Sequence, residues 1–170
     1  MTGPCFVDAN VFIYVRDWRD AAKQARAAEW IETLWDQQLG RTSTQALAEA
    51  YSVATRKLGI SPDGAWHYLE RYLSWKPYPV DEAVLRRAHE IERRYRFAWW
   101  DSTIVAAAQL QDCQLLLTED LPDGAKLGPV TVRNPFTLQA SEAPALYKVE
   151  RRGVPLHRPR GRPRRAAVAA

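Results

Sequence analysis

The sequence has few cysteines and lacks any long hydrophobic run. Its two cysteines, Cys5 and Cys113, are too few for a disulfide framework, and reduced thiols are expected in a cytoplasmic protein. No apolar stretch is long enough to cross a bilayer, and the first residues do not form a basic segment followed by an apolar one. These absences argue against a secreted or membrane protein and favour a cytoplasmic one.

Acidic residues outnumber basic ones once residues 151–170 are set aside. The chain of 170 residues has a formal net charge of +4, but residues 151–170 contain seven arginines and no acid. The remainder holds 17 basic and 20 acidic residues. We therefore expect a mildly acidic domain over residues 1–140, whose spare carboxylates can bind metal, and a basic tail rich in Pro, Arg and Ala over residues 141–170. Such a tail can contact phosphate nonspecifically.

Short apolar strands alternate with amphipathic helices along the acidic part of the chain. Apolar residues at three- and four-residue spacing, with Ser or Asp before them and Gly after them, predict most of the helices. The helix over 97–108 is apolar nearly all round and is expected to be buried. Short strands separated by helices favour an α/β fold with three layers, α/β/α, around a short parallel sheet. Strands are predicted at 6–7, 115–118 and 130–132, and further helices over 21–38, 45–58, after Ser61 and after Asp81.

Four acidic residues are expected to meet at one edge of this sheet. Asp8 and Asp120 each follow a strand, Asp101 begins the buried helix, and Glu49 lies partway along a helix. The carboxyl ends of parallel strands and the starts of the following helices share one edge. Carboxylates that close cannot all be ionised without a counter-ion. Oxygen ligands favour Mg²⁺ or Mn²⁺, whereas the Cys and His residues show no zinc spacing.

Each acid also has an ordinary explanation when taken alone. Asp8 and Asp101 can cap the helices that follow them, and Glu49 can be a solvated helix residue. Acidic turns such as 119–124 are common. The arginines of the helix after Asp81 also have two explanations: they form a solvated face, or they contact RNA or an acidic partner. Trp99 and Trp100 are either core residues or surfaces on which bases stack.

Five stretches, in order, resemble the motifs of PIN domains. No single motif is specific, but their order and spacing match over residues 5–136. The form of the fourth motif is most similar to that of VapC-type toxins from type II toxin–antitoxin modules. The stretches are FVDANV (6–11), STQALAE (43–49), WDSTIVAAA (100–108), LTEDL (117–121, with Gly124 after it) and NPF (134–136).

This resemblance implies a Mg²⁺-dependent endoribonuclease that hydrolyses RNA phosphodiester bonds. Carried over by motif, Asp8, Glu49, Asp101 and Asp120 form the acidic quartet that binds the metal, with Asp8 and Asp101 as principal ligands. Asn10 and Ser43 support the site through hydrogen bonds. Glu119 and Asp123 neighbour the fourth acid and compete for its assignment.

The resemblance also implies a homodimer and a cognate VapB-type antitoxin. The arginine-rich tail is not part of the family pattern. A competing interpretation is a PIN-fold protein that binds RNA or a partner without cutting, although the presence of all four acids argues against it. An unrelated α/β domain, whose acids are caps and turns, is a third interpretation.

Overall fold

A computed structural model describes residues 3–137 as an α/β fold around a five-stranded sheet. The strand order is β2-β1-β3-β5-β4, and every neighbouring pair is parallel except β4 with β5. The predicted fold class is therefore confirmed. The strands are β1 (Cys5–Val7), β2 (Gly40–Arg41), β3 (Leu115–Leu117), β4 (Lys126–Leu127) and β5 (Val130–Arg133).

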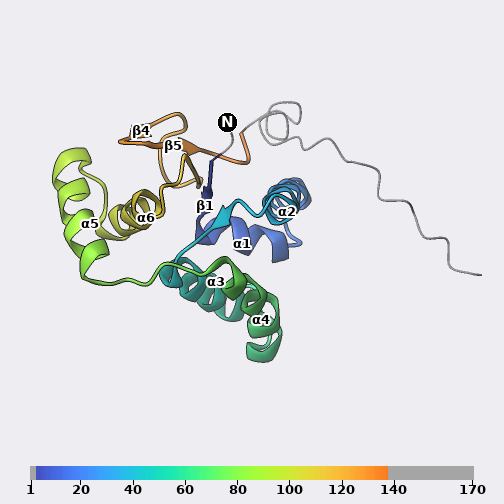
Figure 1. Ribbon diagram of the computed structural model, residues 1–170. Coiled ribbons are helices and arrows are strands. Elements are labelled where there is room, and N and C mark those ends of the chain that lie inside the picture. The colour runs from blue at the N-terminus through green and yellow to red at the C-terminus, as the bar shows by residue number, and fades with distance from the viewer. Residues whose placement is uncertain (1–2, 138–170) are drawn as a thin grey trace, which may run out of the picture.

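Helices flank the sheet on both sides (Figure 1). In that view α5 and α6 lie on one side of β1, and α2 lies on the other. Helix α6 packs against β3 and β5, while α1 contacts both α2 and α3. The helices are α1 (Ala9–Arg16), α2 (Ala21–Asp36), α3 (Thr44–Arg56), α4 (Pro62–Leu69), the 3-10 helix η1 (Glu70–Trp75), α5 (Glu82–Tyr95) and α6 (Trp99–Leu110).

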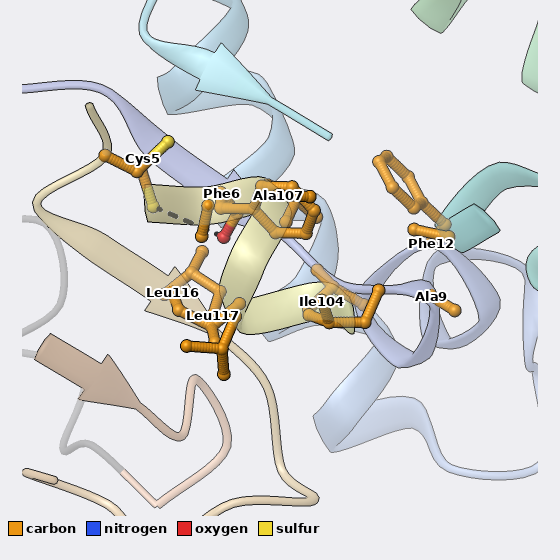
Figure 2. Packing of buried hydrophobic residues seen from close by; sticks show 14 of the residues in the cluster. Cys5, Phe6, Ala9, Phe12, Ile104, Ala107, Leu116 and Leu117 are labelled. Atoms are coloured by element: carbon orange, nitrogen blue, oxygen red, sulfur yellow. Dashed lines mark hydrogen bonds between the residues drawn. The ribbon is translucent and has the colours of Figure 1, made fainter. Parts of the chain in front are cut away.

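One part of the core lies between α6 and strands β1 and β3, and further buried residues come from α1, α2, α3 and α5. Figure 2 shows Phe6 of β1 near Leu116 and Leu117 of β3, with Ile104 and Ala107 of α6 close by. All seven residues from position 102 to position 108 are buried, as expected for a helix that is apolar nearly all round. The central strands are buried on both faces and therefore read as continuous apolar runs.

Two strands were not predicted, because each has only two residues and so shows no periodicity. Gly40 was expected to end a helix, but it begins β2 and pairs with Cys5 of β1. A Cβ atom at Gly40 would collide with the ring of Trp75, so this approach requires glycine. Strand β4 forms a short antiparallel pair with β5.

The predicted division into a domain and a tail, and the predicted lack of a membrane span, concern the whole chain. The basic tail predicted over residues 141–170 lies outside the described residues, so the domain division stays a prediction. Among the helices described, none combines the length and apolar character needed to span a membrane.

Candidate active site

Asp8 lies where β1 ends and α1 begins, and only 7% of it is exposed. Its Oδ1 accepts the Ala9 N–H at 2.7 Å, which caps α1, and its Oδ2 accepts the Thr118 hydroxyl at 2.8 Å. Burial raises the pKa of the Asp8 carboxyl to about 7; the two hydrogen bonds oppose this rise, and the charges of Glu49 and Asp120 add to it. Asp8 is therefore both a helix cap and a member of a group of acids.

Asn10 and Thr118 connect Asp8 to Asp120. The Asn10 side-chain amide donates to Asp120 Oδ2 at 3.0 Å and to Thr118 Oγ1 at 3.0 Å, and lies 3.5 Å from Asp8 Oδ2. Thr118 Oγ1 also accepts the backbone N–H of Asp120 at 3.1 Å. The support predicted for Asn10 has a clear geometry. Sequence reasoning missed Thr118, although its hydroxyl two residues before Asp120 was the available signal.

Glu49 on α3 and Asp101 on α6 complete the group of four carboxylates. Glu49 is an exposed residue, but partial loss of hydration raises its pKa first, the charges of Asp120 and Asp101 raise it further, and Lys57 opposes the shift. The pKa of Asp101 is raised by burial and then by Asp120. These charges place Glu49 and Asp101 in the same region of the molecule as Asp8 and Asp120, and the role of the four acids as one site stays a prediction.

The helix caps near the site are not all the ones that the sequence suggests. Asp101 does not cap α6, because Ala98 occupies the cap position and no side chain bonds there. The buried hydroxyl of Ser43 caps α3 by accepting the Ala46 N–H at 3.1 Å. Ser43 is therefore the cap of the helix that carries Glu49, and its predicted support of the site stays a prediction.

The two acids that competed with Asp120 have other partners. Glu119 accepts a hydrogen bond from Lys23 Nζ at 2.7 Å, and that ammonium group also lies 2.9 Å from the Tyr14 hydroxyl. Both contacts raise the pKa of Lys23. Asp123 accepts the Asn134 N–H and lies 3.8 Å from Arg133. Asp120 is thus the acid of this loop that joins the group.

The chemistry of the quartet fits a hard divalent cation. Burial and mutual repulsion raise the pKa of Asp8, Glu49 and Asp101, and a cation among them would offset both effects. Across residues 3–137, however, no three acidic, histidine or cysteine side chains are gathered tightly enough to form a ready-made metal-binding group. The carboxylate oxygens are suitable ligands for Mg²⁺ or Mn²⁺, but the side chains lie farther apart than in a preformed metal site.

The chain belongs to the PIN domain family, whose model matches residues 5–121. Among solved structures it is similar to Mycobacterium tuberculosis VapC20, described as a toxin that cleaves the Sarcin-Ricin loop. The two share 20% identity with a TM-score of 0.55, over 68% of this chain and 89% of VapC20. At that identity the likeness concerns the fold. No curated protein matches the chain.

Proposed function

We propose that this PIN domain protein is a Mg²⁺-dependent endoribonuclease and acts as the toxin of a type II toxin–antitoxin system. The observation that carries the proposal is that hydrogen bonds through Asn10 and Thr118 tie Asp8 to Asp120. Glu49 and Asp101, from two further motifs, lie close enough for charges to act between them and this pair. Membership of the PIN family supports it, and so does the fold shared with VapC20, a toxin that cleaves RNA.

In this proposal Asp8 and Asp101 are the principal metal ligands, and Glu49 and Asp120 complete the acidic quartet. A bound Mg²⁺ or Mn²⁺ would supply the positive charge that lowers the pKa of an attacking water and offsets charge on the phosphate oxygens. Asn10 and Thr118 hold the carboxylates of Asp8 and Asp120 in a fixed relation through hydrogen bonds of 2.8 to 3.0 Å. Their part is to position the quartet before substrate arrives.

The test is cleavage of total RNA by the wild type and by Asp8→Asn, with Mg²⁺ and with EDTA. An asparagine keeps the oxygen that caps α1, so the variant should fold, but it lacks the negative charge and should lose cleavage by about 100-fold or more. Asp81→Asn is the matched control, because Asp81 caps α5 and is not part of the quartet. Equal cleavage by Asp8→Asn and wild type would reject the assigned chemistry.

A PIN-fold protein that binds RNA without cutting it is the second candidate function. The loose spacing of the acids within residues 3–137 favours it. In that case neither wild type nor Asp8→Asn cleaves RNA with Mg²⁺ or Mn²⁺, and the two proteins bind RNA with similar affinity. Cleavage by the wild type alone excludes this candidate.

We further propose a cytoplasmic protein with two protein partners: a second copy of the chain and a VapB-type antitoxin. Exposed apolar side chains support protein partners, since Trp66 is 53% exposed and Leu73 is 49% exposed along a groove beside α3 and α4. Co-expression with the product of a small neighbouring reading frame, followed by co-purification and measurement of the mass in solution, tests both partners. A monomer that captures no such product would contradict them.

A further inference from the structure

Trp100 stands out on the surface next to the acidic quartet. It lies in the first turn of α6, directly before Asp101, and 64% of it is exposed. Its neighbour Trp99 is partly buried against the core. We propose that Trp100 is a platform on which an unpaired base of the RNA stacks beside the bond to be cut; this rests on the proposed function.

The position of Trp100 is fixed relative to the helix that carries Glu49. The Thr103 hydroxyl lies 2.7 Å from the Trp100 carbonyl oxygen and 2.6 Å from Gln45 Oε1. Gln45 Nε2 lies 3.4 Å from the same Trp100 carbonyl. Because Gln45 belongs to α3, these contacts join α3 and α6 at the edge of the quartet. An indole on a fixed backbone presents a large flat face at a low cost in conformational entropy.

The charges that precede Trp100 in the chain favour nucleic acid as its partner. The quartet by itself repels a phosphate backbone, so bound RNA needs cations close by. Arg93, Arg94 and Arg96 are exposed at the end of α5, and four residues of chain keep Arg96 within about 14 Å of Trp100.

These arginines differ from the others on the same helix. Arg86 and Arg87 form ion pairs with Glu82 and Glu90. Within the part of the chain that the structure describes, no carboxylate lies within ion-pair distance of Arg93 or Arg96. Arg93 and Arg96 therefore carry positive charges that are exposed and not neutralised by a described carboxylate, as a contact with phosphates requires.

Stacking on Trp100 also defines the class of RNA. A base inside a duplex has both faces covered by its neighbours, whereas a base in a loop or a single strand can leave the stack and lie on an aromatic ring. We therefore expect RNA that is unpaired at the cleavage position. Stacking tolerates any base, so Trp100 selects an accessible base more than a particular sequence.

The test measures binding of a short fluorescent single-stranded RNA, and of the same RNA annealed to its complement, on the Asp8→Asn background with Mg²⁺. Trp100→Ala should weaken single-strand binding by about 5- to 100-fold, and Trp100→Phe should restore most of it. The matched control is Trp18→Ala, because Trp18 is 63% exposed and follows α1, a helix about 12 Å long whose opposite end is capped by Asp8. Duplex binding should be weak and insensitive to Trp100.

Each alternative outcome has a separate meaning. Equal binding by the Trp100→Ala and Trp18→Ala variants overturns the inference, and it leaves the proposed function standing if the wild type cleaves RNA. Loss of single-strand binding on Trp100→Ala, in a protein whose wild type never cleaves, supports base stacking on Trp100 but rejects the nuclease and, with it, a cleavage site beside the stacked base. A change in solution mass on Trp100→Ala assigns the indole to a protein interface and also overturns the inference.

Discussion

The two oxygens of the Asp8 carboxylate have different partners. Oδ1 bonds the first turn of α1, and Oδ2 bonds Thr118, a residue 110 positions away. These bonds stabilise the ionised carboxylate, but the effect of burial is larger, so the pKa of Asp8 is raised to about 7. The residue therefore holds a charge that the native protein alone accommodates poorly.

The metal-free protein should lose stability as the pH rises from about 4 to about 7. Below this range Asp8 is protonated in both the folded and unfolded states, and above it the folded state must bury a charge that the unfolded state exposes to water. The shift corresponds to on the order of 4 kcal/mol. Thermal unfolding in EDTA should show this slope as the difference between wild type and Asp8→Asn, and Mg²⁺ should abolish it. A pH-independent difference would contradict the raised pKa.

Thr118→Val should lower activity and Mg²⁺ affinity by about 10- to 100-fold while the fold is retained. Valine has nearly the shape of threonine but removes the hydroxyl that donates to Asp8 and accepts from Asn10. Mg²⁺ binding measured by calorimetry separates a loss of affinity from a loss of turnover. Thr55→Val is the control, because the Thr55 hydroxyl bonds carbonyl groups of its own helix. Similar behaviour of the two variants would argue against a positioning role for Thr118.

At the scale of elements, α2 is tied to the loop that carries Asp120. Lys23 of α2 binds Glu119 and lies over the rings of Tyr14 and Phe136 at 4.4 and 5.1 Å. This contact keeps the Glu119 carboxylate paired outside the quartet, so that one acid of the loop faces the site and its neighbour does not.

The Lys23–Glu119 pair should contribute about 1 kcal/mol of coupling energy in a double-mutant cycle with Lys23→Met and Glu119→Gln. The pair is partly buried, with side chains 31% and 24% exposed, and solvent screens it less than a fully exposed pair. The Arg86–Glu82 pair is 76% and 77% exposed and should give a markedly smaller value. Urea unfolding measures both cycles. Equal coupling in the two pairs would show that Lys23 has no special part in holding the loop.

The elements differ in how far sequence could predict them. Helix α5 was predicted because its cap and its apolar stripe are local patterns, and Asp81 caps it as expected. Strand β2 could not be predicted, because its two residues form a strand only through their pairing with β1. The close approach of Gly40 to the Trp75 ring could not be predicted for the same reason, because the two residues are far apart in the chain.

At the scale of the whole molecule, the sheet order brings distant motifs to one edge. Strands β1 and β3 are adjacent and parallel, so Asp8 and Thr118 follow paired strand ends. Helix α6 packs on β3 and brings Asp101 to that region, while α3 packs on α1 and brings Glu49. The predicted meeting of the four acids requires this strand order. The sequence indicated that order through the resemblance of its motifs to those of PIN domains.

The sequence by itself determined the apolar strands and the capped helices, because these follow from local chemistry, and its motif order predicted which four acids form the site. The tertiary structure decided the rest. It paired Glu119 with Lys23, set Thr118 between Asp8 and Asp120, and turned Trp99 toward the core and Trp100 toward solvent. The first two of these contacts join residues that are far apart in the chain, and the orientation of the tryptophans depends on which face of α6 packs against the core. A local sequence pattern contains neither kind of information.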